Sequence, residues 1–314
     1  MKYLNFSLFF IFFTTTCFSQ DIVKTSAPDT ISNWEKKNML GLDISQIAFV
    51  NWNAGGINSI SGLLKGHFIR NYRKNNLKWS NEMIFRYGIN KQEGVELRKT
   101  DDVFSLNSTV GYKKSENSNW YTTGRFSFNT QFTNGYAYPN TDNPISRLFA
   151  PAYVFLGIGS EYANKEKKLN VYISPLTMKT TFVLDRNLAN QGAFGVQKAV
   201  VDTAGNIIQD GEFYRLELGF LLTSSYKKEI YKNIFWDNRI SLYSDYINRF
   251  GNIDVDWQMQ LDLVVNKYVR ANIGAHFIYD DDIKAKEEVN GEQITVGPKL
   301  QFKQLLGVGV VYSF

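Results

Sequence analysis

The chain has 314 residues, of which 44% are hydrophobic and 15% aromatic, and its formal net charge is +5. No internal stretch approaches the ~18 continuous apolar residues that a membrane-spanning helix needs, so helical spanning is excluded. A basic excess of this modest size favours attraction to anionic lipid headgroups over nucleic-acid binding.

The first 19 residues have the pattern of a secretory signal peptide. Lys2 is the only charge before Asp21, and an apolar run over 4–13 precedes the small residues that end at Ser19. We expect cleavage after Ser19, which removes the only cysteine, Cys17. The alternative, in which Cys17 is the acylated residue of a lipoprotein, stays open. After cleavage the net charge falls from +5 to +4, and no thiol remains for a disulfide or a zinc site.

Residues 20–37 are predicted to form a periplasmic N-terminal segment, and residues 38–314 a single all-β domain. Apolar and polar side chains alternate with period two over 77–89, 214–226, 253–265 and 269–279. Successive side chains of a strand point to opposite faces, so each of these segments has one apolar and one polar face.

The connections between the predicted strands alternate in length. Short ones near 73–76, 113–119, 164–168, 227–233 and 266–268 alternate with longer ones near 51–58, 90–101, 133–150, 177–211, 247–252 and 281–292. Short turns on one side and long loops on the other are typical of a transmembrane antiparallel β-barrel with periplasmic turns, here of about 12 strands.

A soluble β-sandwich would alternate too, but its strands are usually ~5–6 residues long, whereas these approach or exceed the ~9–11 that a tilted membrane strand requires. Aromatic residues on the apolar faces also flank the short turns: Tyr72, Trp79, Tyr112, Trp120, Tyr162, Tyr226 and Trp236. An interfacial girdle predicts such a recurrence. We therefore expect the apolar faces to meet lipid and the polar faces to line the barrel interior.

The C-terminal residues alternate in the same way. Val310, Tyr312 and Phe314 share the apolar face of the last strand. A terminal aromatic after such alternation resembles the signal that the β-barrel assembly machinery recognises, so we expect this machinery and outer-membrane lipid to be partners.

Three short stretches resemble a known family: Asn51–Asn58 (NWNAGGIN), Ser174–Lys179 (SPLTMK) and Gly297–Gln304 (GPKLQFKQ). They are similar to an uncharacterised Bacteroidota family of outer-membrane β-barrels, a domain of unknown function, and the similarity extends from about Trp34 onward. The resemblance implies a porin-like barrel in the cell outer membrane and supplies no catalytic residues.

Twelve side chains are candidates for the lumen lining: Glu82, Arg86, Arg125, Arg215, Glu217, Asp237, Arg239, Asp254, Asp256, Asp262, Arg270 and His276. Their signs are mixed. Paired across strands, they would form a network that fills the interior; hydrated and unpaired, they would line a pore. Barrels of this strand number lie between filled small barrels and open porins, so both alternatives stand, with a narrow or plugged lumen preferred.

No catalytic, cofactor-binding or metal-binding residues are predicted. The alternation sends both histidines, His67 and His276, inward, whereas an outer-membrane lipid hydrolase would need a serine and a histidine facing lipid. The acidic run at 280–282 lacks the ligand spacing of an EF-hand and reads as a solvated loop tip. The long connection over 177–211 is the place where a constriction, a lid or a partner-binding loop is expected.

Three functions follow from this reading, none of them involving a nucleic acid or a cofactor. The first is a narrow pore or uptake channel. The second is a non-conducting structural or docking subunit of an envelope complex, whose protein partner the sequence does not name. The third, a minor alternative, is an outer-membrane lipid hydrolase.

Overall fold

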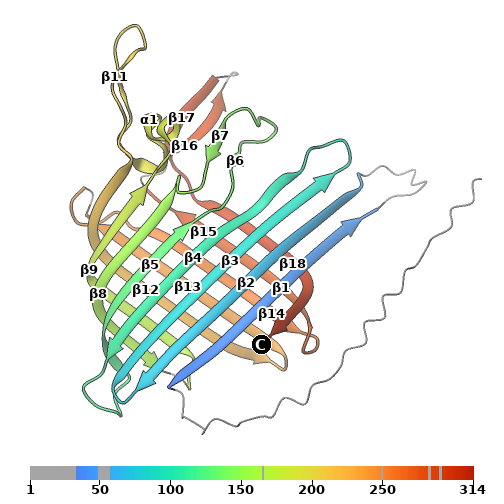
Figure 1. Cartoon of the computed structure of the whole chain (residues 1–314), viewed down its shortest axis with the longest axis vertical. Coiled ribbons are helices and arrows are strands. Elements are labelled where there is room, and N and C mark those ends of the chain that lie inside the picture. Colours follow the sequence, from blue (N-terminus) through green and yellow to red (C-terminus); the bar gives the residue numbers. More distant parts are fainter. Residues whose placement is uncertain (1–32, 49–56, 165, 249, 282–283, 290–291) are drawn as a thin grey trace, which may run out of the picture. The chain divides into compact units, whose positions relative to one another are not determined.

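The computed structural model describes residues 33–48, 57–164, 166–248, 250–281, 284–289 and 292–314. Twelve antiparallel strands close into a barrel in the order β1-β18-β15-β14-β13-β12-β9-β8-β5-β4-β3-β2. They are β1 (Trp34–Ile47), β2 (Ser59–Lys74), β3 (Leu77–Gln92), β4 (Arg98–Tyr112), β5 (Trp120–Thr130), β8 (Ala152–Asn164), β9 (Leu169–Phe182), β12 (Tyr214–Tyr231), β13 (Ile234–Asp245), β14 (Asp254–Val264), β15 (Val269–Tyr279) and β18 (Gln301–Ser313). The predicted fold class is confirmed (Figure 1).

Closure joins the first strand to the last. Met39 lies opposite Ser313 and Leu42 opposite Val310 in the β1–β18 pair. Asn38 and Phe314 exchange two backbone hydrogen bonds, of 3.2 and 3.1 Å. Because every strand has a neighbour on both sides, the barrel has no free edge, which is the condition for backbone groups to be satisfied in hydrocarbon.

The barrel begins four residues before the predicted boundary. Residues 34–37, assigned from the sequence to the periplasmic segment, are part of β1, where Trp34 lies opposite Tyr72. The Trp34 ring packs against Tyr72 and Trp79, with centroid distances of 5.2 and 5.7 Å, and these contacts extend the strand. The predicted leader over 1–19, including Cys17, lies outside the described residues.

Several connections are shorter than predicted because the strands run on. β9 continues to Phe182, so the long connection spans 183–213 and not 177–211; Thr177 and Thr181 are buried in the sheet. β12 continues to Tyr231, which reduces the predicted turn at 227–233 to two residues. The β3–β4 connection is confined to 93–97.

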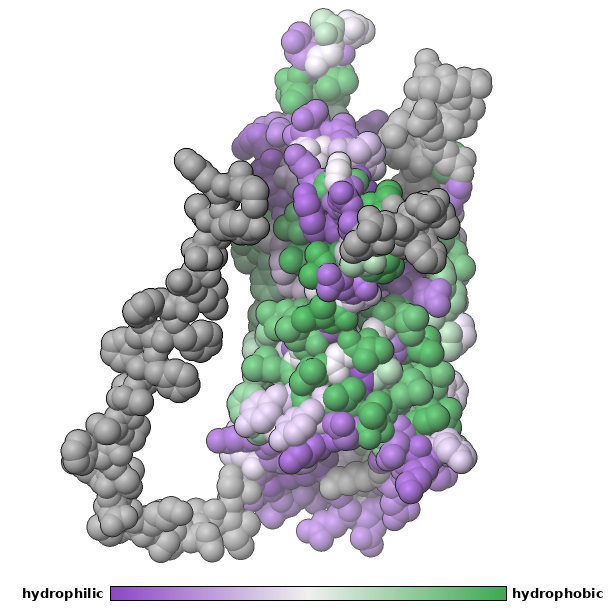
Figure 2. All heavy atoms as spheres, turned by 90° about the vertical axis from the view of Figure 1, so that its right-hand side faces the viewer, coloured by the Kyte–Doolittle hydropathy of each residue, from purple (hydrophilic) through white to green (hydrophobic). Residues whose placement is uncertain are grey.

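The outer surface of the barrel is apolar. On the face formed by β1, β15 and β18, Figure 2 shows hydrophobic residues gathered around the middle, between hydrophilic residues at the two ends. Exposed side chains on these strands include Leu42, Ile273, Leu306 and Val308. An apolar exterior of this kind is the reverse of the usual soluble pattern.

Aromatic rings pack in groups at the short-turn end. Besides the Trp34 group, Trp120 packs against Tyr162 at 5.3 Å and Tyr226 against Trp236 at 6.0 Å. Each pair joins neighbouring strands beside a short turn. The predicted recurrence of rings at these turns is therefore present.

The interior holds mainly polar side chains. Glu217 is 1% exposed, Glu161 3% and Lys179 6%. Tyr172, Leu221 and Tyr243 form a small apolar cluster among them. No helix within the described residues is long and apolar enough to cross a membrane.

Three connections at the long-loop end contain secondary structure of their own, as far as the described residues show. The β9–β12 connection contains α1 (Arg186–Asn190), η1 (Ala193–Gly195) and the hairpin of β10 (Val200–Val201) and β11 (Ile207–Gln209). Ala150, Val183, Leu188, Ala189 and Val196 form a local apolar core beneath α1. The β15–β18 connection contains a second hairpin, β16 (Lys284–Val289) and β17 (Glu292–Pro298).

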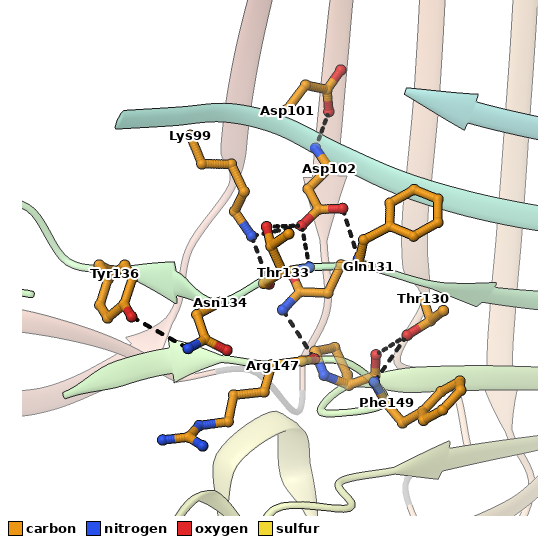
Figure 3. Close-up of polar contacts among 12 residues, drawn as sticks. Lys99, Asp101, Asp102, Thr130, Gln131, Thr133, Asn134, Tyr136, Arg147 and Phe149 are labelled. Atoms are coloured by element: carbon orange, nitrogen blue, oxygen red, sulfur yellow. Dashed lines mark hydrogen bonds and ion pairs between the residues drawn. The ribbon is translucent and has the colours of Figure 1, made fainter. Parts of the chain in front are cut away.

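The β5–β8 connection, which contains β6 (Gly135–Tyr136) and β7 (Pro144–Ser146), is held against β4. The Asp102 carboxylate accepts hydrogen bonds from the backbone N–H of Phe132 and Thr133, at 2.7 and 2.9 Å, and from Lys99 Nζ at 2.9 Å (Figure 3). Charge-assisted bonds of this kind are among the stronger ones. The connection is thus fixed at the rim of the barrel.

Candidate functional site: the charged lumen

Ion pairs cross the barrel interior between strands that are not neighbours. Lys179 on β9 lies 2.9 Å from Asp254 on β14 and 3.5 Å from Glu217 on β12. β9 and β14 are three positions apart in the sheet order, so such a contact can form only through the interior. Asp280, 3.9 Å away, and Arg215, 3.3 Å from Glu217, complete what we call the Lys179 cluster.

A second group of contacts joins strands β3, β5, β8 and β12 inside the barrel. Lys78 on β3 lies 2.7 Å from the Glu161 carboxylate on β8. Thr123 donates to the same carboxylate at 3.3 Å. Arg125 on β5 donates to Thr223 on β12 at 2.7 Å and stacks over the Tyr172 ring at 4.0 Å. These contacts draw β3, β5, β8 and β12 together around the lumen.

One contact spans the whole interior. Arg239 on β13 lies 4.0 Å from Glu82 on β3, and these strands are six positions apart in the order of twelve. Asp237 also contacts Arg239, at 3.2 Å, and His67 Nε2 lies 2.6 Å from Glu82. We call the Arg239–Glu82 contact the lumen bridge. It joins opposite walls of the barrel.

The lumen bridge lies between two cavities. The first chamber, of about 650 Å³, is lined by residues of β2–β5, β8, β9 and β12–β14; the second, of about 310 Å³, lies toward β1, β15 and β18. Arg239 and Gln258 line both. The lumen is therefore not completely filled.

The structure distributes the twelve predicted lumen residues over these features. Glu82, Arg125, Arg239 and Asp256 line the first chamber, and Arg86, Asp237, Arg239, Asp262, Arg270 and His276 line the second. Arg215, Glu217 and Asp254 line neither chamber, because they belong to the Lys179 cluster.

Both histidines line the second chamber and contact carboxylates. His276 Nε2 lies 2.9 Å from Asp256, which also accepts from Gln258 at 3.2 Å. His67 contacts Glu82, as described above. Within the part of the chain that the structure describes, no three His, Cys, Asp or Glu side chains gather in a way that could hold a metal ion.

Sequence reasoning missed the residue at the centre of the largest cluster. The sequence predicts a connection over 177–211 that contains Lys179, whereas the β8–β9 and β9–β12 pairings shift register near Pro175 and β9 continues to Phe182. Lys227 lies in the turn predicted at 227–233, although β12 continues to Tyr231. The signal that could have found Lys179 is the resumed alternation of Thr177, Lys179 and Thr181 after the irregularity.

Comparisons with known proteins agree with the fold and leave the activity undefined. A family model described as "Protein of unknown function (DUF3078)" matches residues 44–136. It includes the first of the three family-like stretches, whereas those at 174–179 and 297–304 lie beyond it. Among curated proteins no sequence matches the chain significantly.

Two solved structures illustrate the similarity in architecture. The translocator domain of autotransporter NalP from Neisseria meningitidis is 11% identical, with a TM-score of 0.38, over 90% of this chain and 87% of that one. The COG4313 outer membrane channel from Pseudomonas putida F1 is 11% identical, with a TM-score of 0.42, over 89% of this chain and 95% of that one. At these scores neither bears on activity.

Proposed function

We propose that the chain is an outer-membrane barrel whose lumen is a narrow pore for small polar solutes. The closed sheet, the apolar exterior and the aromatic groups at the short turns support a membrane location. In this arrangement the short turns lie in the periplasm and the long loops outside the cell. Outer-membrane lipid would cover the belt seen in Figure 2.

The observation that carries the pore function is the pair of chambers inside the barrel. Cavities of about 650 and 310 Å³ are lined by charged, amide and hydroxyl side chains together with apolar ones such as Phe155 and Leu305. Polar cavities of this size hold water, because a single water needs only ~10–15 Å³ of space for its centre. A barrel that served only as a membrane anchor would gain nothing from unfilled polar space.

The lumen bridge that separates the chambers is weak enough to yield. The Arg239 side chain is 45% exposed and that of Glu82 27% exposed. Exposed ion pairs contribute ~0–1 kcal/mol. Separating Arg239 from Glu82 therefore costs little free energy and opens a narrow passage between the chambers. A narrow passage predicts a small conductance.

A second candidate is a non-conducting docking subunit of an envelope complex. The observation that favours it is the β9–β12 connection, where Leu188 and Ala189 of α1 pack in an apolar cluster with Ala150 of the β5–β8 connection. Its hairpin also exposes Val201 and Ile208, which are 55% and 68% exposed. Such a loop would suit a protein partner.

Planar-bilayer recording separates these two functions. The refolded protein is expected to give small, steady single-channel currents. Complete silence of correctly folded protein, judged by circular dichroism and resistance to protease, would rule out the pore and leave the docking subunit.

The lipid hydrolase remains a minor alternative. Both described histidines line the second chamber, away from the lipid-facing surface where that chemistry would act. We therefore expect no phospholipid turnover by the purified protein, with or without Ca²⁺. Hydrolysis above the background of a refolding control would reinstate the enzyme.

The C-terminal strand fits recognition by the assembly machinery. Phe314, Tyr312 and Val310 are 59%, 59% and 57% exposed on the outer surface. Deletion of Phe314 is expected to lower the amount of assembled barrel in the outer membrane while leaving the secreted precursor in the periplasm. Normal assembly of the deletion variant in cells would remove this role.

A further inference from the structure

The second chamber has an excess of basic side chains. Six line it: Lys65, Arg86, Lys227, Arg239, Arg270 and Lys303. Two of them share one acid, because Arg86 and Lys303 lie 3.0 and 2.9 Å from Asp101. Lys65 lies 2.8 Å from Asp43. The lining itself contains three carboxylates, those of Asp101, Asp237 and Asp262.

The remaining acids are divided in the same way. Lys227 lies 3.4 Å from Asp262 and 3.5 Å from Asp237. Arg239 contacts Asp237 and, across the lumen bridge, Glu82. Among the described residues, these five carboxylates thus contact five basic side chains, a sixth carboxylate, that of Asp256, contacts His276, and the sixth basic side chain is Arg270.

Arg270 has no ion pair and no side-chain hydrogen bond to any described residue. Its Nε atom is buried without a partner, while the side chain lines the second chamber. Two residues along the same face of β15, Asn272 is 4% exposed, and its Oδ1 atom is also buried without a partner. Buried polar atoms without partners are uncommon, and each calls for a ligand or an ordered water.

We propose that Arg270 binds a small oxyanion in the second chamber, of the class of inorganic phosphate and short carboxylates, and that the pore therefore prefers anions. A guanidinium presents two parallel N–H groups that match the two oxygens of such an anion. A water could satisfy Nε but would leave the charge uncompensated. The selectivity part rests on the proposed pore function, whereas the binding site does not.

The size and walls of the chamber limit the ligand. A volume of about 310 Å³ admits an anion of a few heavy atoms with part of its hydration shell. Asn272, two residues along the same face of β15, can offer its amide N–H groups to an anion, whereas its unpartnered Oδ1 atom accepts and calls for a donor such as water. The neighbouring Asp43 carboxylate is neutralised by Lys65, so it does not cancel the attraction.

Two measurements test the site. In bilayers, the reversal potential across a KCl gradient should show greater permeability for chloride than for potassium, and phosphate or acetate on one side should lower the chloride current. In detergent, titration calorimetry with inorganic phosphate, and separately with acetate, should detect binding without requiring conduction. The two anions distinguish a phosphate site from a carboxylate site.

Three variants give the comparison. Arg270→Gln should weaken phosphate or acetate binding by about tenfold or more, since a charge-assisted pair is lost. It should also bring the chloride and potassium permeabilities together. Arg270→Lys keeps the charge and loses the paired N–H groups, so it should retain chloride preference with weakened oxyanion binding. Arg186→Gln, an identical change in the exposed Arg186–Asp210 pair, should match wild type.

Each outcome bears on a different statement. A silent channel that still binds phosphate through Arg270 would remove the pore and retain the site. A conducting channel without anion preference would remove the selectivity while the pore stands. Binding that is absent in wild type, or equal in wild type and Arg270→Gln, would overturn the oxyanion site.

Discussion

The Lys179 cluster and the lumen bridge both join distant strands by ion pairs, but they differ in exposure. The Lys179 and Glu217 side chains are 8% and 2% exposed, against 45% and 27% for Arg239 and Glu82. Buried charges depend on their partners, whereas exposed ones are compensated by water. The Lys179 cluster therefore acts as a structural tie, meaning that it stabilises the fold. The lumen bridge contributes little to stability and can open.

The largest effect is expected from Lys179→Met. Removing this ammonium takes away the ion-pair partner of Asp254 and leaves Glu217 with Arg215, and breaking a buried pair in this way costs ~3–5 kcal/mol. Urea unfolding in lipid vesicles measures the change. The control is Lys228→Met on the exposed part of β12, which should change the free energy of unfolding little. A loss at Lys179 as small as at Lys228 would show that the cluster is not a structural tie.

The next effect concerns the outer surface. Leu261→Arg should cost ~2–4 kcal/mol if the residue lies near the bilayer midplane. The next residue, Asp262, faces the lumen. Asp262→Asn should be tolerated because Lys227 still has its ion pair with Asp237. Equal losses in the two variants would argue that lipid does not cover the apolar face.

A smaller effect on stability, with a clear functional readout, is expected at the lumen bridge. Glu82→Gln removes the attraction across the lumen, which contributes ~0–1 kcal/mol, together with the carboxylate charge that His67 contacts, and should increase single-channel conductance. The amide matches the carboxylate in size, so steric changes are minimal. Unchanged conductance together with unchanged stability would mean that the bridge does not limit the passage.

The smallest effect lies at the tip of the β10–β11 hairpin. Asp202 accepts hydrogen bonds from Asn206 and Ala204, and these bonds, first of all that from the Asn206 N–H, lower the pKa of its carboxyl. Because this pKa is lowered, the ionised carboxylate stabilises the turn at pH values above the pKa of the unfolded chain. This stabilisation is lost as the pH falls through the pKa of the folded state. Protease cleavage within 200–209 should therefore accelerate only below about pH 4. Asp202→Asn should abolish that pH dependence.

The strands and their closure could be predicted from the sequence because alternation is a local property. The apolar side chains of Ile253, Trp257 and Val265 recur at even spacing, and the alternation of short and long connections predicts about twelve such segments, as the barrel has. Where a bulge interrupts alternation, as near Pro175, the prediction ends a strand too early.

The pairing within the lumen could not be predicted in this way. Alternation assigns Arg239 to a face but gives no information on which residue it meets across the barrel, because Glu82 lies far away in the sequence. The same is true of Arg270, whose lack of a partner depends on how five neighbouring carboxylates are shared. These are properties of the closed barrel as a whole.

Single-channel conductance of the refolded wild-type protein tests the account most directly. The divided polar lumen predicts small, steady currents that grow when Glu82 is replaced by glutamine. Silence of both proteins, in preparations whose folding is verified, would contradict the pore.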